Sequence, residues 1–273
     1  MSSRWAKAGL VIAIIWVLAL ACQALIQSDK LSFLPQLIRG VGATSRQETL
    51  THASTDLMEV IVTTQNGSVV LLGTDTAEEI KIEANYQAWG MNKAAAQERL
   101  MEMDTEIIQE GNRLFIRAVY ATLRGQHAIS YQITLPSSLA ARVQTSNGAI
   151  TVEDLSGKLD LTTSNGRITV SATEGPNELT ARTSNGSINI AASPTGGTYN
   201  LRTSNGSVKI DLPENLGVKV SARTSNGSIN LGPGQWTIAG GKLEKTRVDA
   251  QRGNGELELI VTTSNGSISL RKL

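Results

Sequence analysis

The chain is poor in the residues from which most metal and redox centres are built. It has 273 residues, with one cysteine and two histidines. A single cysteine excludes an intrachain disulfide framework and any zinc site made of several thiolates. The two histidines, His52 and His127, leave little material for a His-rich metal centre, and we expect both to be solvated. The composition therefore predicts no metal and no cofactor.

Aromatic residues and an excess of charge are also scarce. Aromatics make up 4% of the chain, and 25 basic residues nearly balance 24 acidic ones. The low aromatic content argues against an aromatic-lined ligand pocket. The near-equal numbers of basic and acidic residues leave no basic field that would steer nucleic acid, so we expect no nucleic-acid partner. With 25 glycines, the composition favours a β-rich fold with many turns.

Residues 1–26 carry the pattern of an export or anchor segment. Arg4 and Lys7 precede an uncharged apolar run from Ala8 to Cys22, which with the next four residues reaches the ~20 residues that span a bilayer. A basic start and an apolar run are also typical of a signal peptide. The segment that ends in Cys22 loosely resembles a bacterial lipoprotein box.

Three fates of this segment therefore stay open: an uncleaved membrane anchor, lipidation at Cys22, and cleavage with release. In the first two the chain is tethered to the membrane, which is then its first expected partner. The positive-inside rule places the remainder of the chain on the extracytoplasmic side, in the cell envelope. Residues 27–55 show no sustained period and many serines and threonines, so we predict a linker there.

An internal repeat dominates the rest of the chain. The string Thr-Ser-Asn-Gly occurs six times, and the glycines of its first five copies are 18, 20, 20 and 21 residues apart. A seventh copy at 64–67 differs at one place, and 252–255 resembles a worn copy. The residues expected to form structural corners are Asn66, Gly67, Thr145, Asn147, Gly148, Thr163, Asn165, Gly166, Thr183, Asn185, Gly186, Thr203, Asn205, Gly206, Thr224, Asn226, Gly227, Thr263, Asn265 and Gly266.

Apolar residues alternate with polar ones on both sides of each copy. Leu179 and Ala181 precede the copy at 183–186, and Ile188 and Ile190 follow it. Period two predicts β-strands with one buried face, so each unit is a strand, a corner and a second strand. The motif threonine shares the buried face, and we expect its hydroxyl to bond local backbone at the bend. Asn and Gly suit the positive φ that we expect at the corner.

Two architectures satisfy this pattern. Asn-Gly between alternating strands is a strong hairpin signal, which gives an antiparallel meander. In the alternative, a right-handed parallel β-solenoid, each ~20-residue unit is one coil and identical residues stack in ladders, including asparagines whose amides bond one another. Nothing in a hairpin requires Thr and Ser before every Asn-Gly, so we favour an all-β solenoid over residues 56–273.

Both ends of the solenoid need protection from edge-to-edge pairing. Residues 92–103 have high helix propensity and begin with a capping asparagine, which predicts a short helical insertion that covers one end. We expect Arg271 and Lys272 to protect the edge formed by the last strand.

The sequence resembles a known family. The segment Val62–Val69, the Leu-Pro entry at 135–139 and the successive Thr-Ser-Asn-Gly-Ser-Ile units are similar to the bacterial candidate adhesin domains built of β-strand repeats, and to the head domains of candidate autotransporter adhesins. The resemblance covers about residues 56–273. It implies a β-helix-like solenoid and envelope association, in some members with a link to envelope stress responses. It supplies no catalytic residues.

Three functions follow, in order of preference. Outward acids such as Glu153, Asp160 and Glu178 are scattered and form no evident pair, so we favour a non-catalytic, envelope-tethered, adhesin-like protein that presents a polar surface to a glycan, the cell wall or a protein. The first alternative is a structural or regulatory component of an envelope stress system. The second is a carbohydrate-active β-helix enzyme, which needs acidic or basic side chains that converge in one groove.

Overall fold

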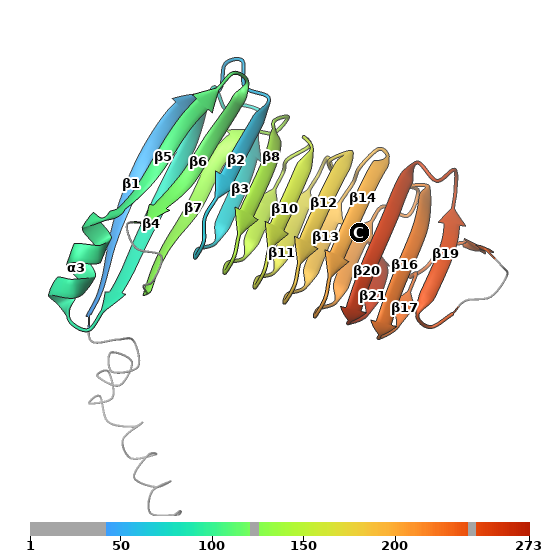
Figure 1. Ribbon diagram of the computed structural model, residues 1–273. Helices are drawn as coiled ribbons and strands as arrows, with labels where there is room; N and C mark the ends of the chain where they lie inside the picture. Colours follow the sequence, from blue (N-terminus) through green and yellow to red (C-terminus); the bar gives the residue numbers. More distant parts are fainter. Residues whose placement is uncertain (1–41, 121–125, 240–243) are drawn as a thin grey trace, which may run out of the picture.

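The computed structural model describes residues 42–120, 126–239 and 244–273, which form an elongated stack of strands (Figure 1). The only helix in these ranges is α3 (Lys93–Met101), and the other regular elements are β-strands. The strands belong to two sheets, and their buried apolar side chains form one continuous core. The all-β prediction is confirmed. The predicted anchor at 1–26 lies outside the described residues.

The two sheets contain the following strands, given in spatial order. Sheet 1 consists of β1 (Gly42–Ala53), β4 (Glu79–Gly90), β7 (Gln126–Pro136), β3 (Val69–Thr74), β9 (Ile150–Glu153), β11 (Ile168–Ala172), β13 (Ile188–Ala192), β15 (Val208–Leu212), β21 (Ile268–Lys272) and β17 (Ile229–Asn230). Sheet 2 consists of β18 (Thr237–Ile238), β19 (Arg247–Arg252), β16 (Val218–Asn226), β20 (Leu257–Asn265), β14 (Gly197–Thr203), β12 (Glu178–Thr183), β10 (Leu159–Thr163), β8 (Ala140–Thr145), β2 (Glu59–Thr63), β6 (Arg113–Tyr120) and β5 (Met103–Glu110).

One coil consists of a strand from sheet 2, a corner, and a strand from sheet 1. In the middle of the stack β12 ends at Thr183 and β13 begins at Ile188. Neighbouring coils pair in parallel and in register, so Thr183 lies between Thr163 and Thr203. The two strands that flank this corner belong to different sheets and do not pair with each other. The parallel solenoid is therefore confirmed, and the hairpin meander is wrong.

The period-two pattern decides which face of each strand is buried. In β10 the side chains of Leu159, Leu161 and Thr163 point inward, and those between them point outward. Leu161 stacks on Val143 in one neighbouring strand and on Ala181 in the other, and all three are fully buried. Since burying a leucine side chain contributes ~1.5–3 kcal/mol, a shift of one residue would expose a whole row of the core.

The coils do not stack in the order of the sequence at either end of the molecule. The coil β2–β3 lies between β6–β7 and β8–β9, although β6 and β7 follow it in the chain. Near the other end the last coil, β20–β21, lies between β14–β15 and β16–β17. Both inserted coils pair in parallel on each side. The repeat therefore defines the coil but not its position in the stack.

Antiparallel strands and the helix finish the end of the stack near β1. β1 pairs with β4 over residues 42–53, so the linker predicted for 27–55 is wrong over this range. The alternation of polar and apolar residues in β1 is weak because threonine, glutamine and serine fill both faces of this edge strand. The predicted helix is confirmed as α3, and Asn92 caps it by accepting a hydrogen bond from the backbone N–H of Ala95 at 2.8 Å.

Three further expectations, about two short segments and one histidine, are wrong. Residues 252–255 form a turn through Gly253 and Gly255, both at positive φ, after β19 has run antiparallel to β16, so they are no solenoid corner. Strand β21 is not the last strand of sheet 1, because β17 pairs with it at Ile268 and Ser269, so the last strand of the chain does not form the sheet edge that Arg271 and Lys272 were expected to protect. His127 is not solvated, because its place on an inward position of β7 leaves it only 6% exposed.

Candidate functional site

The Thr-Ser-Asn-Gly corners lie above one another along one edge of the stack. The motif threonines are buried, between 2% and 7% exposed, as the sequence predicts. Their hydroxyls do not bond local backbone. Thr183 Oγ1 donates to the carbonyl of Gly166 in the neighbouring coil at 3.0 Å, and Thr203 Oγ1 donates to Gly186 at 2.8 Å. The same bond recurs at Thr145, Thr163, Thr224 and Thr263.

The expected partner was wrong because the corner carbonyl points along the stack rather than back into its own turn. The buried hydroxyl is thus satisfied by a group that exists only once two coils have docked. Each threonine therefore fastens one coil to the next.

The motif asparagines form the predicted ladder. Asn185 Nδ2 donates to Oδ1 of Asn165 at 2.8 Å and accepts from Asn205 Nδ2 at 2.9 Å. We call the whole row the amide ladder, and in spatial order it consists of Asn66, Asn147, Asn165, Asn185, Asn205, Asn265 and Asn226. Six of these side chains are exposed, and Asn66 is half-buried.

The motif glycines are required by close approach rather than by positive φ. Of these seven glycines only Gly67 has a positive φ, 155°. A Cβ atom at Gly186 would lie 1.9 Å from the carbonyl oxygen of Gly166, and a Cβ at Gly206 would lie 1.9 Å from that of Gly186. No side chain fits, so glycine lets the coils approach to hydrogen-bonding distance.

The corner edge retains hydrogen-bonding capacity after the coils have docked. An asparagine amide has two N–H donors and an oxygen with two lone pairs. Inside the ladder Asn185 uses one donor and one lone pair for its neighbours, which leaves one of each for another molecule. The preceding serines, such as Ser184 and Ser204, are exposed. The edge thus offers the same donors and acceptors once per coil.

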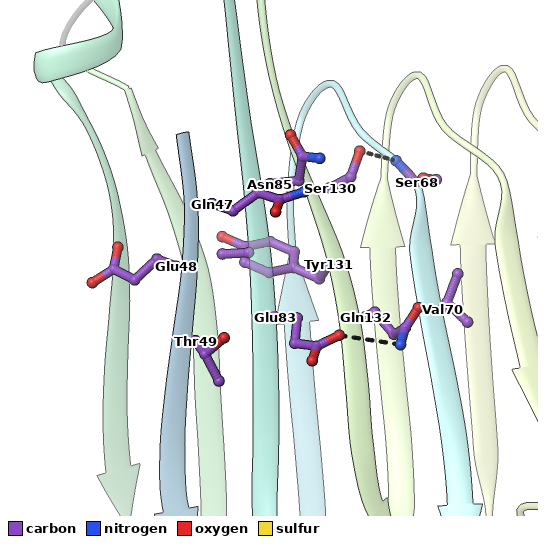
Figure 2. Close-up of a pocket in the computed structure, with 11 residues that line it drawn as sticks. Gln47, Glu48, Thr49, Ser68, Val70, Glu83, Asn85, Ser130, Tyr131 and Gln132 are labelled. Atoms are coloured by element: carbon purple, nitrogen blue, oxygen red, sulfur yellow. Dashed lines mark hydrogen bonds between the residues drawn. The ribbon is translucent and has the colours of Figure 1, made fainter. Parts of the chain in front are cut away.

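A separate polar hollow of about 380 Å³ lies where the antiparallel strands β1 and β4 meet β7 and β3 (Figure 2). Glu83 accepts a hydrogen bond from Gln132 Nε2 at 3.2 Å, and Ser130 Oγ accepts from the backbone N–H of Ser68 at 3.2 Å. Asn85 Oδ1 is buried and has no partner among the described residues. The hollow can accept a small polar group, and the sequence did not reveal it because β1 was expected to be linker.

The hollow and its surroundings hold no nucleophile activated by a base in the described ranges. Tyr131 reaches it, but burial raises the pKa of its phenol well above the usual value, so the group stays neutral. Its hydroxyl lies 3.1 Å from Thr105 Oγ1, which in turn lies 2.7 Å from the hydroxyl of Tyr86. Tyr86 donates to Glu48 at 3.1 Å. This chain of hydroxyls joins β1, β4, β5 and β7.

A second hollow lies at the opposite end of the stack, between β18 and β19. The Arg252 guanidinium is 5.1 Å from the ring centre of Trp236, which packs against the core. Arg252 also donates to the carbonyls of Pro213 and Leu216 at 3.0–3.3 Å. This arginine therefore holds the connection between β15 and β16.

The described ranges contain no group of three or more His, Cys, Asp or Glu side chains placed to hold a metal ion. They also contain no helix with the length and apolarity needed to cross a membrane. Cys22, the candidate for lipidation, lies outside them.

Comparison with solved structures finds the same fold elsewhere. A candidate cell adhesion protein from Clostridium sporogenes superposes with a TM-score of 0.52 at 13% identity, over 84% of this chain and all of that one. Candidate adhesins from Bacteroides fragilis and Parabacteroides distasonis give TM-scores of 0.39 and 0.40 at 10% and 12% identity, over 85% of this chain and 100% and 98% of theirs.

Among curated proteins none matches the sequence. A family model does match, over residues 126–271, which is more than half of the chain. This range contains β7, all six exact copies of the motif and most of the amide ladder. The chain is therefore a member of the Toastrack DUF4097 family.

Proposed function

We propose that the protein is a non-catalytic, envelope-tethered, adhesin-like solenoid that binds a glycan, the cell wall or an envelope protein through its polar surface. The observation that carries the proposal is the amide ladder, whose exposed amides repeat along one straight edge. Strands in a sheet are ~4.8 Å apart, so the edge repeats one donor and one acceptor at that interval.

A rigid row of identical groups suits a ligand that also repeats. When a polymer contacts several coils at once, each contact after the first is intramolecular, and weak contacts add up to useful avidity. The bonds from Thr183 and Thr203 to neighbouring coils hold the spacing fixed, so little ordering cost is left for the moment of binding. The fold shared with the candidate adhesion protein of Clostridium sporogenes supports this assignment.

The tether rests on the sequence of the N-terminal segment, in which Arg4 and Lys7 precede the apolar run. We expect the protein to fractionate with membranes and to resist extraction by alkaline carbonate. The variant Cys22→Ser separates the two kinds of tether, because it removes a covalently attached lipid from a lipoprotein and changes nothing in a chain held by a spanning anchor. Recovery of the intact wild-type repeat region in the soluble fraction would overturn the tether.

Binding is tested with the detergent-solubilised full-length protein on a glycan array and on purified cell-wall sacculi. We expect binding that weakens in Asn185→Ala and Asn205→Ala and that stays at the wild-type level in Asn189→Ala. Asn189 is the matched control because it lies on the outer face of sheet 1 and makes no side-chain hydrogen bond among the described residues. Turnover of a glycan by the purified protein would reverse the non-catalytic assignment.

A further inference from the structure

The outer face of sheet 2 carries a row of arginines that only the strand register reveals. Arg182 in β12 lies directly opposite Arg202 in β14. Arg202 is opposite Thr262 in β20, which is opposite Arg223 in β16. Arg223 is opposite Arg247 in β19. We call these four residues the arginine row, and they occupy four of five adjacent strands (Figure 1).

The arginine row points into solvent. Each of the four side chains is exposed, whereas the flanking residues Ala181 and Thr183, for example, are buried. Four strand spacings of ~4.8 Å give the row a length of ~19 Å. The row lies beside the amide ladder, because each of the first three arginines stands three residues before a ladder asparagine.

The two central arginines, Arg202 and Arg223, have no ion-pair partner among the described residues, although the carboxylate of Asp249, the partner of Arg247, also interacts electrostatically with Arg223. Arg182 and Arg247, at the two ends of the row, form ion pairs with Asp160 at 3.7 Å and with Asp249 at 3.4 Å. Arg202 and Arg223 form neither an ion pair nor a side-chain hydrogen bond in the described part of the chain. Like charges directly opposite each other on a sheet are destabilising, so the pairs Arg182–Arg202 and Arg223–Arg247 cost folding free energy.

The other half of the same face shows how this sheet compensates its charges elsewhere. There acids and bases alternate across the strands. Glu59 lies 3.1 Å from Arg113 and 3.6 Å from Arg142, and Asp160 lies 3.6 Å from Arg142. The uncompensated charge is thus confined to the arginine row, although the whole chain has a net charge of only +1.

The groups beside the arginine row are hydroxyls and amides rather than aromatic rings. Exposed serines follow two residues after the row position in each of the four parallel strands: Ser184, Ser204, Ser264 and Ser225. The amide ladder comes next, and Thr262 places a hydroxyl inside the row itself. The next positions on the other side, Thr180, Asn200, Ile260, Ser221 and Asp249, supply no aromatic side chain on which a nucleobase could stack.

We propose that the arginine row binds a linear acidic polysaccharide that carries a carboxylate on its sugars and lies across the strands, parallel to the axis of the stack. Guanidinium groups bind carboxylates through paired, charge-assisted hydrogen bonds. The serines and ladder amides bind the sugar hydroxyls. This inference rests on the proposed function and gives it a substrate class.

The probe is polygalacturonate, tested by calorimetry with the solubilised full-length protein. We expect binding that weakens as salt rises, and no binding of neutral dextran. Arg202→Gln and Arg223→Gln should each lower the affinity roughly tenfold, as expected for the loss of one charge-assisted hydrogen bond, and the double variant roughly a hundredfold. Both residues are exposed, and we expect the variants to melt at or slightly above the wild-type temperature because a repulsion is relieved.

Arg142→Gln is the matched control, since it removes the same charge from the same face at a compensated position. We expect less than a twofold change in affinity. An equal loss in Arg142→Gln and Arg202→Gln would show unspecific attraction and overturn the site. Monomeric galacturonate should bind roughly a hundredfold more weakly than an oligomer that spans the row, because the later contacts become intramolecular.

Two further outcomes overturn the inference and leave the proposed function standing. Polyphosphate or single-stranded DNA that binds as tightly as polygalacturonate, with the same dependence on Arg202 and Arg223, would make the row a general anion site. Binding of cell-wall sacculi that persists unchanged in the double variant would place the adhesive contact elsewhere. If neither sacculi nor any arrayed glycan binds, both proposals fail together.

Discussion

Asn265 donates its side-chain N–H to Asn205 at 2.8 Å, although 60 residues separate them in the chain. Asn226 follows Asn205 by one repeat in the sequence but lies one coil farther away, where its amide donates to Asn265 at 2.8 Å. The last coil of the chain is therefore inserted between two coils that are consecutive in sequence. It joins the same amide ladder because all motif corners share one geometry.

The amide ladder should contribute measurably to stability. Asn185→Ala removes one bond to Asn165 and one from Asn205. At ~0.5–1.5 kcal/mol for each bond, we expect the free energy of unfolding to fall by roughly 1–3 kcal/mol. Urea denaturation measures this, with Asn189→Ala as control, for which we expect a change within ~0.5 kcal/mol. An equal loss of stability in Asn185→Ala and Asn189→Ala would show that the amide ladder does not stabilise the fold.

The motif glycines should tolerate no side chain. In Gly186→Ala the new Cβ would meet the carbonyl oxygen of Gly166 at 1.9 Å, so the coils must separate. We expect a loss of about 3 kcal/mol or more. Gly111→Ala is the comparison, because its Cβ meets nothing within 4 Å and only the φ of +60° opposes it, at a cost of ~1–2 kcal/mol. Thermal unfolding should rank the two variants in this order, and the reverse order would refute the close-approach explanation.

The buried His127 should make stability depend on pH. Burial, with a further contribution from the charge of Arg99, lowers the pKa of His127 below its ordinary value of 6.5. Between these two pKa values the unfolded chain binds a proton that the folded chain does not, so stability is lost as the pH falls below 6.5. The free energy of unfolding, measured from pH 7.5 to 5, should show this slope.

The variant His127→Phe tests the origin of that slope. Phenylalanine preserves the ring contact with Tyr120, whose centre lies 4.4 Å from that of the imidazole, and it removes the titrating group. Between pH 6.5 and 5, we expect the free energy of unfolding of the variant to depend much less on pH than that of the wild type. Its unfolding transition should be as cooperative as that of the wild type. A slope that is unchanged in the variant would assign the effect to other groups.

Removal of the inserted coil should leave a shorter stack rather than an unfolded end. In a chain truncated after residue 256, β16 has lost β20, but β14 presents an equivalent strand. We expect β16 to dock in parallel on β14, with Asn226 bonded to Asn205. Hydrogen exchange should then show protected amides at 218–224, as in β10 and β12. Rapid exchange over 218–224 would show that β16 cannot pair with β14 in place of β20.

The local part of this structure was predictable because it depends on a short-range pattern. Alternation around Leu159 and Leu161 indicates a strand with one buried face, and its recurrence at a nearly constant interval predicts parallel coils. The inward threonines and the amide ladder follow from the same count. The partner of the threonine hydroxyl did not follow, because Gly166 becomes available to Thr183 only in the stacked state.

Weak or mixed patterns were misleading. The polar strand β1 shows little alternation and was expected to be linker, and its pairing with β4 became evident only in the tertiary structure. His127 was expected to be solvated because its neighbours in sequence resemble a loop, whereas packing against Tyr120 buries it. The polar hollow beside β1 was missed for the same reason.

The sequence by itself determined the coil: its strands, its corner and the face that is buried, since each depends on residues within about one repeat. Only the tertiary structure decided the order of the coils, because near-identical backbones pair equally well with one another and the connections and end strands select among them. It also decided which charges meet. Arg202 and Arg223 belong to one row because β20 lies between their strands, and no spacing in the sequence expresses that register.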